Sequence, residues 1–186
     1  MSNFTASFLD LGSIYTTKAY ILQLLHDGPC SQQRTSKSTP LIYMCILAPN
    51  GHGAMLDLPE SDSVRSVLDW ALENDKIMIS LCHDPAAFLA AGYGREHNPF
   101  SGYTMCVFPD DLDSGANIEI GYLPGKMPWA LGEALKAEGI NIVNDTMSGA
   151  TYRDRNLLTG DSPLASNQLG IMSAEALLEQ AAKRDK

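Results

Sequence analysis

The sequence has few basic residues, no paired cysteine motif and no long apolar run, and each shortage excludes a class of protein. Its 13 lysines and arginines face 22 aspartates and glutamates, so the formal net charge is −9. A nucleic-acid or anionic-membrane partner needs clustered positive charge, which this balance disfavours. No apolar run approaches the length of a membrane span, and the chain begins without a basic-then-apolar secretory signal. We therefore expect a cytoplasmic protein that binds neither nucleic acid nor membrane.

The four cysteines are scattered along the chain, without a C-x-x-C spacing and without a histidine cluster around them. This pattern predicts free thiols in a reducing compartment. Cys45 and Cys106 lie in apolar runs, which favours a role as core fillers. Cys30 opens a polar stretch and is interpreted as an incidental loop thiol. Cys82 stands in a different setting and is treated separately below.

The bulk composition is that of one globular domain. The chain has 186 residues, of which 45% are hydrophobic and 19% charged, so it is long enough to bury a core. From residue 41 onward, short apolar runs alternate with helical patterns, which is typical of an α/β sandwich with a mostly parallel sheet. The predicted strands are Leu41–Pro49, Lys76–Leu81, Tyr103–Pro109 and Ile140–Asn144, and the predicted helices are Ser61–Asp75, Pro85–Gly92, Pro128–Gly139 and Pro163–Ala182.

The apolar runs also predict which strands lie in the central sheet. A strand shielded on both faces loses the alternation of polar and apolar residues. On this basis we expect the central parallel sheet to contain the segments around Leu41–Ala48, Lys76–Leu81 and Asn141–Val143, with helices on both faces. Lys76–Leu81 is predicted to be an inner strand of this sheet.

Residues 1–40 are weakly patterned, so we expect the α/β domain to occupy residues 41–186. Within the first part, Thr16–Pro29 has the spacing of one amphipathic helix, and Cys30–Pro40 is predicted to be a polar loop or linker. If residues 1–40 do not complete the first layer of the sandwich, apolar sheet or helix surface stays exposed, and such surfaces usually mark interfaces. We therefore expect a homodimer, or a larger assembly, in which Thr16–Leu25 takes part.

A cysteine and a histidine stand side by side where a predicted strand turns into a helix, in "SLCHDPAAFL" (Ser80–Leu89). In an open parallel sheet, functional groups collect at the carboxyl ends of the strands. A thiol there is near the positive end of the next helix, and this position together with a nearby imidazole lowers its pKa and favours the nucleophilic thiolate. A Cys-His pair is also compatible with a structural role, but its position favours catalysis by Cys82.

Five longer motifs follow one another in a fixed order. They are "NGHGAMLDLPES" (Asn50–Ser61), "ISLCHDPAAFLA" (Ile79–Ala90), "FPDDLD" (Phe108–Asp113), "EIGYLPGKMPWALGEALKAEGINIVND" (Glu119–Asp145) and "YRDRNLLTGDSPLASNQLG" (Tyr152–Gly170). Together they resemble the HchA family, the glyoxalase III and chaperone branch of the PfpI-like superfamily. The resemblance spans residues 41–180 and implies a flavodoxin-like three-layer α/β sandwich with a mostly parallel central sheet. It also implies a cofactor-free conversion of methylglyoxal to D-lactate, with related roles as deglycase and as holdase chaperone in stress.

The resemblance assigns roles to three residues. Cys82 matches the family's nucleophile and His83 its neighbouring acid/base. Asp113, within "FPDDLD", matches the acid that orients the histidine. In such a triad the third group fixes the tautomer of the imidazole and stabilises its charged form.

The turn after the first predicted strand carries a second set of candidates. Gly51 and Gly53 flank His52, and glycines there let backbone N–H groups approach and polarise a carbonyl oxygen. His52 matches a family position too, but a structural turn histidine is the favoured interpretation. Asp110 and Asp111 are interpreted as a solvated acidic loop.

Two departures from the family pattern affect the expected activity. Family members carry a longer amino-terminal half with a catalytic Glu and the metal ligands, whereas the first Glu of this chain is Glu60. We therefore expect a truncated amino-terminal part, no metal and no cofactor. The family also has "CHGP" where this chain has Asp84 after His83. A carboxylate there narrows the backbone choice and favours the protonated thiol, so erosion of the site is favoured over a new chemistry.

Two functions therefore remain open at this point. The first is a thiol-dependent glyoxalase III-type enzyme, with impaired activity, that acts on small 2-oxoaldehydes. The second is a non-catalytic truncated paralogue that serves as holdase chaperone or interaction module, with unfolded or glycated proteins as partners. Lactate production from methylglyoxal distinguishes the two.

Overall fold

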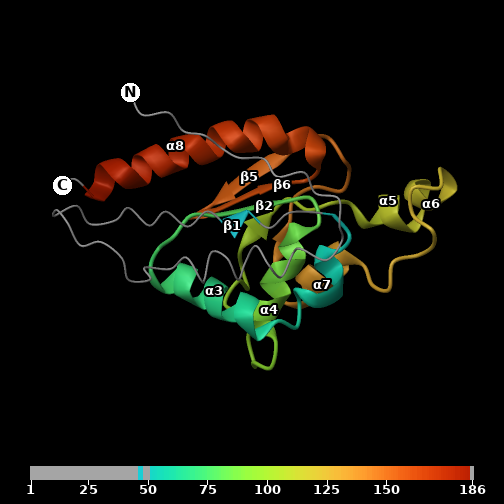
Figure 1. Cartoon of the computed structure of the whole chain (residues 1–186), viewed down its shortest axis with the longest axis horizontal. Coiled ribbons are helices and arrows are strands. Elements are labelled where there is room, and N and C mark those ends of the chain that lie inside the picture. Colours follow the sequence, from blue (N-terminus) through green and yellow to red (C-terminus); the bar gives the residue numbers. More distant parts are fainter. Residues whose placement is uncertain (1–45, 48–50, 185–186) are drawn as a thin grey trace, which may run out of the picture. The chain divides into compact units, whose positions relative to one another are not determined.

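The structure is a computed structural model that describes residues 46–47 and 51–184 (Figure 1). These residues all belong to one compact unit of the chain. The predictions for residues 1–40, including the helix and interface role of Thr16–Leu25, lie outside the described residues. So do Cys30, Cys45 and most of the predicted strand Leu41–Pro49, of which only Ile46–Leu47 is described as strand β1.

A four-stranded sheet forms the centre of this unit. Its strands run in the order β1, β2 (Met78–Leu81), β6 (Leu157–Gly160) and β5 (Thr151–Asp154). The first three are mutually parallel, and β5 runs antiparallel to β6, with which it forms a hairpin. Because β2 pairs on both sides and is buried along most of its length, the prediction of an inner strand at Lys76–Leu81 is confirmed.

Strands β3 (Thr104–Met105) and β4 (Asn141–Ile142) form a separate parallel pair. The prediction that Asn141–Val143 belongs to the central sheet is therefore wrong. The neighbouring place beside β2 is taken by β6, all four residues of which are buried, whereas Asn141 is exposed. The predicted strand Tyr103–Pro109 is also shortened, because the backbone N–H of Val107 donates to the side chain of Asn144 rather than to a neighbouring strand.

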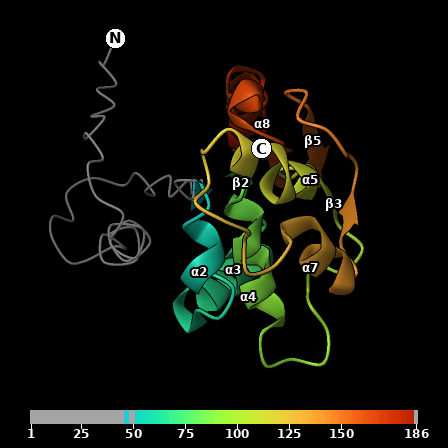
Figure 2. The same ribbon diagram turned by 90° about the vertical axis from the view of Figure 1, so that its right-hand side faces the viewer.

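One long helix covers one face of the central sheet (Figures 1 and 2). Helix α8 (Ser166–Arg184) follows the one-turn 3₁₀ helix η2 (Pro163–Ala165). Together they occupy nearly the same residues as the predicted helix Pro163–Ala182. The apolar residues buried together on this face come from β2 and the residue before it, from β6 and from α8, and they are Ile77, Ile79, Leu158, Leu169 and Ala176.

The opposite face is covered by a group of shorter helices (Figure 2). They are α2 (Ala54–Asp57), α3 (Asp62–Glu73), the 3₁₀ helix η1 (Asp84–Phe88), α4 (Leu89–Gly92) and α7 (Leu131–Ala137). Ser61 is the N-cap of helix α3, and its Oγ accepts a hydrogen bond of 3.4 Å from the backbone N–H of Val64. Two further short helices, α5 (Asp110–Ser114) and α6 (Ala116–Glu119), follow β3.

The helices on the two sides of the sheet confirm the predicted α/β sandwich (Figures 1 and 2). The sheet brings the ends of β2 and β6 together, and the segments that follow β2 and β3 lie beside them. Among the residues that the structure describes, no helix combines the length and the apolar character needed to span a bilayer.

Candidate functional site

The site is built around the turn that follows β2. The backbone of Cys82 has φ +64°, a left-handed conformation that a cysteine rarely adopts. Two backbone hydrogen bonds hold it there: Cys82 N–H donates to Gly160 O at 2.9 Å, and Cys82 O accepts from Phe108 N–H at 2.9 Å. Strained residues held in this way by their surroundings cluster at functional sites. The thiol therefore lies where β2 meets η1, as the sequence predicts.

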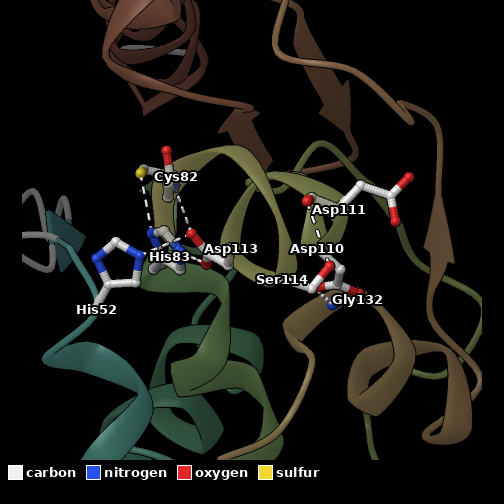
Figure 3. Close-up of polar contacts among 9 residues, drawn as sticks. His52, Cys82, His83, Asp110, Asp111, Asp113, Ser114 and Gly132 are labelled. Atoms are coloured by element: carbon white, nitrogen blue, oxygen red, sulfur yellow. Dashed lines mark hydrogen bonds and ion pairs between the residues drawn. The ribbon is translucent and has the colours of Figure 1, made fainter. Parts of the chain in front are cut away.

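Cys82, His83 and Asp113 form a continuous chain of polar contacts (Figure 3). Cys82 Sγ lies 3.2 Å from His83 Nδ1, and His83 Nε2 lies 2.6 Å from Asp113 Oδ2. All three residues are buried, the His83 side chain being only 1% exposed. The ring of Phe108 stacks on His83 with centroids 4.5 Å apart, so the imidazole is held on its face as well as at both nitrogens. The structure thus brings together the three residues for which the resemblance predicts catalytic roles.

The charges in this chain decide which nitrogen of His83 carries a proton. Burial opposes the ionisation of Asp113, but the hydrogen bonds from His52, His83 and Asn117 more than offset it and lower its pKa. Burial also lowers the pKa of His83, against the opposing effect of Asp113. A neutral His83 beside an ionised Asp113 donates Nε2–H to the carboxylate. Its Nδ1 is then an acceptor that faces the thiol, which is the arrangement a general base requires.

The thiol itself is not poised as a thiolate. The pKa of Cys82 is raised from 9.0 to about 12, with burial as the largest cause; a hydrogen bond from the backbone of His83 lowers it, and the negative charges of Asp84, Asp113 and Asp161 raise it. The expectation of a lowered pKa is therefore wrong, because burial outweighs the hydrogen bond from the start of η1. Helix η1 is a 3₁₀ helix of five residues, and so short an element has a weak dipole to set against burial.

Asp84 is buried, with 1% of its surface exposed, and one carboxylate oxygen lies 3.4 Å from the backbone nitrogen of Leu81. The structure supports the expected effect of Asp84 on the thiol, but not the expected restriction of the backbone. Its charge raises the pKa of Cys82, after the larger effect of burial. Among the described residues, however, the non-glycine positions with positive φ are Asp75, Cys82 and Arg155, so the turn does not require a glycine at position 84.

Removing the charge of Asp84 is expected to ease deprotonation of the thiol. We expect Asp84→Asn to lower the pKa of Cys82, but to leave it above the ordinary value because burial is the larger cause. Asp84→Gly should act in the same direction, and both variants should raise the rate of any reaction in which Cys82 attacks. The measurement is the pH dependence of Cys82 alkylation by iodoacetamide, with Asp111→Asn as the control at an exposed acid. If neither the pKa nor the rate changes in both Asp84 variants, the charge of Asp84 does not act on the thiol.

His52 belongs to the site, which the sequence interpretation as a structural turn residue did not anticipate. Its Nε2 lies 2.9 Å from Asp113 Oδ1, and its ring centroid is 4.1 Å from that of His83. Gly51 has φ +83°, a conformation that favours glycine, whereas Gly53 has φ −59° and open space where a Cβ would lie. The predicted oxyanion role of these two glycines stays a prediction.

Asp110 and Asp113 of α5 both accept hydrogen bonds from neighbouring helices. Asp110 accepts hydrogen bonds from the backbone N–H groups of Gly132 at 2.9 Å and Glu133 at 3.1 Å, so it caps the start of α7 instead of being a solvated acid. Asn117 donates to Asp113 Oδ1 at 2.8 Å, a contact that sequence reasoning missed. Its only signal in the sequence is the spacing of four residues from Asp113.

The same side chains have the composition of a cation site. His52, His83 and Asp113 each offer one ligand atom, and these atoms lie within 4.8 Å of one another. A cation bound there would need an imidazole lone pair from each histidine and an oxygen of Asp113, so it would disrupt the hydrogen bonds that now join the two histidines to Asp113. Asp113 also lines a pocket of about 160 Å³, together with other residues of α5 and with Met127 and Trp129 from the segment before α7.

Comparisons with known proteins identify relatives of similar sequence and similar fold. No family model matches the chain. Over 136 residues it is 54% identical to the protein/nucleic acid deglycase HchA of Staphylococcus aureus strain bovine RF122 / ET3-1, and 53% identical to that of strain JH9. The match covers 73% of this chain and 47% of each relative, so the chain spans about half the length of the curated relatives it matches.

Solved structures share the fold. One solved structure is 28% identical, with a TM-score of 0.59, and the match covers 71% of this chain and 58% of that one. The rapid encystment protein of Francisella tularensis (TM-score 0.58, covering 69% and 55% of the two chains) and glyoxalase III of Candida albicans (0.54, covering 68% and 54%) are each 18% identical. At 18% identity, the similarity to these two structures supports the fold alone.

Proposed function

The matched part of the chain belongs to the HchA family of protein/nucleic acid deglycases, and from this we propose that the chain is a glyoxalase III-type enzyme. In this proposal it converts methylglyoxal to D-lactate without glutathione or any other cofactor, and Cys82 is the nucleophile. The single observation that carries the proposal is the contact chain from Cys82 Sγ through His83 to Asp113. A thiol, a neutral base and an orienting carboxylate are the parts that a covalent thiol mechanism needs.

The first step is the capture of the aldehyde. Cys82 Sγ forms a bond to the aldehyde carbon, C1, while His83 Nδ1 takes the thiol proton and passes it to the aldehyde oxygen. The product is a hemithioacetal. Because the pKa of Cys82 is about 12, the proton leaves during the attack and not before it, which makes the contact of 3.2 Å between Sγ and Nδ1 the key distance.

The later steps move a proton between the two carbons of the adduct. Loss of the C1 proton and protonation of the C2 oxygen give an enediol. Protonation of C2 and loss of the C1 hydroxyl proton then give a lactoyl thioester, so C1 is oxidised and C2 reduced within one molecule. Water cleaves the thioester and returns the proton to the thiol. We propose that the raised pKa of Cys82 and the charge of Asp84 keep the activity below that of other family members.

A holdase role is the second candidate, and a surface observation favours it. Several large apolar side chains are exposed, including Leu56 (71%), Ile120 (76%) and Leu178 (71%). Exposed apolar surface is what a chaperone offers to unfolded chains.

Deglycase action on glycated proteins would use the same Cys82 chemistry as the glyoxalase reaction. The cytoplasmic location and the homodimer stay predictions of the sequence.

The test of the proposed function is lactate formation by the purified full chain. We expect D-lactate from methylglyoxal in buffer without glutathione, at a rate proportional to protein concentration and with no added metal. The parallel assay is suppression of the aggregation of a heat-denatured client protein. Suppression of aggregation together with no lactate above the background would reject the enzyme and leave the holdase.

A further inference from the structure

The isomerisation in the proposed reaction needs two proton carriers, and the contact chain described so far supplies one. His83 Nδ1 faces Cys82 Sγ, and its Nε2 is held by Asp113. Once the adduct has formed, one group must move the proton from C1 to C2, and another must exchange protons with the two oxygens. A second titratable group beside the thiol would divide this work with His83.

His52 lies where such a group has to be. Its ring centroid is 4.1 Å from that of His83, while Cys82 Sγ is 3.2 Å from Nδ1 of the same histidine. A three-carbon adduct on Sγ therefore comes within reach of both rings. In Figure 3 the His52 ring and the Cys82 sulfur are drawn on the same side of His83.

The hydrogen bond to Asp113 sets the tautomer of His52. Asp113 has a lowered pKa, and its Oδ1 lies 2.9 Å from His52 Nε2. An ionised carboxylate accepts a proton, so Nε2 carries the hydrogen and Nδ1 has the free lone pair. Figure 3 shows this second nitrogen turned away from Asp113.

Exposure also separates the two histidines. The side chain of His83 is 1% exposed, whereas that of His52 is 19% exposed, so His52 can exchange protons with water. Tyr122 lies beside His52, and the centroids of the two rings are 5.9 Å apart. A group that is anchored on one nitrogen and reaches water with the rest of its ring suits the return of a proton to C2.

We propose that His52 is a catalytic residue of this chain: its Nδ1 takes the proton from C1 of the hemithioacetal and delivers it to C2. The C1–H bond breaks and its electron pair forms the enediol double bond, while the C2 oxygen takes up a proton. The pair of that double bond then forms the C2–H bond, and the O–H pair of the C1 hydroxyl becomes the thioester carbonyl as its proton leaves. The chain thus has a proton carrier encoded in its Gly-His-Gly turn. This inference rests on the proposed function.

The experiment compares His52→Gln with wild type on methylglyoxal and on methylglyoxal deuterated at C1. Glutamine keeps an N–H that can donate to Asp113 but has no basic nitrogen, so it separates a proton carrier from a residue that only positions Asp113. We expect lactate formation to fall roughly 10²–10⁴-fold, the contribution typical of a general base. The deuterium effect on the remaining rate should increase. Loss of the free Cys82 thiol on mixing with methylglyoxal should be unchanged, because capture uses His83.

Two further variants complete the test. His97→Gln is the matched control, because His97 is 84% exposed, and its rate should equal that of wild type. His52→Ala should regain activity when imidazole is added, which a folding defect would not allow. If wild type makes lactate and His52→Gln makes it at the same rate, the inference is overturned and the proposed function stands. If wild type makes no lactate, both are overturned.

Discussion

Replacing Cys82 by serine is expected to abolish lactate formation from methylglyoxal. A serine hydroxyl is a far weaker nucleophile than a thiol, and the alkoxide it would have to form is less accessible in a buried site. Loss of a member of a catalytic triad typically lowers the rate on the order of 10⁴-fold, so the expected rate is that of the background. The measurement is the initial rate of D-lactate formation at saturating methylglyoxal, with thermal unfolding of the variant followed in parallel.

The matched control makes the same change at a second buried thiol. Cys106 is 1% exposed, and its backbone N–H donates to Thr159 Oγ1 at 2.9 Å, so it is packed as a core residue. Cys106→Ser should lower the unfolding temperature more than Cys82→Ser does, but should keep the activity of the folded fraction. Full activity in Cys82→Ser, or loss of activity in both variants at equal stability, would contradict the assignment of the nucleophile.

The sheet shows where the sequence was sufficient and where it was not. Lys76–Leu81 is a mostly apolar run that follows a capped helix, and its place inside the sheet follows from that pattern. The β5–β6 hairpin was missed, although β6 is a fully buried partner of β2. Its strands have four residues each, and its turn places Arg155 at φ +56° without the glycine that normally signals such a turn.

The candidate site divides in the same way. Cys82 and His83 are neighbours in the chain, and Asp113 was assigned by its motif, so these three could be named before any coordinates. His52 and Asp113 are 61 residues apart, and only the fold brings them to 2.9 Å. The pKa of Cys82 was expected to be low because the sequence shows the helix start, but it does not show how completely the surrounding elements bury the sulfur.

The buried thiol leads to the second large expected effect, on the intrinsic reactivity of Cys82. A pKa of about 12 instead of 9.0 lowers the fraction present as thiolate at neutral pH about a thousandfold. Alkylating agents react with the thiolate, so Cys82 should be nearly inert to iodoacetamide at pH 7. Turnover should not share this dependence, because His83 removes the proton during the attack. Since burial lowers the pKa of His83, this base stays neutral above pH 6.5, and its protonation should lower activity only as the pH drops below that value through the lowered pKa.

The central claim is that Cys82 works as a neutral thiol beside a neutral imidazole, and the alkylation of Cys82 across pH tests it most directly. The rate is measured by mass spectrometry of the Cys82 peptide between pH 6 and pH 11, alongside the rate of lactate formation over the part of that range in which the protein stays folded. The account predicts that alkylation keeps rising beyond pH 9, while lactate formation is already level at pH 7. Alkylation that levels off below pH 8, or turnover that rises with pH in parallel with alkylation, would contradict it.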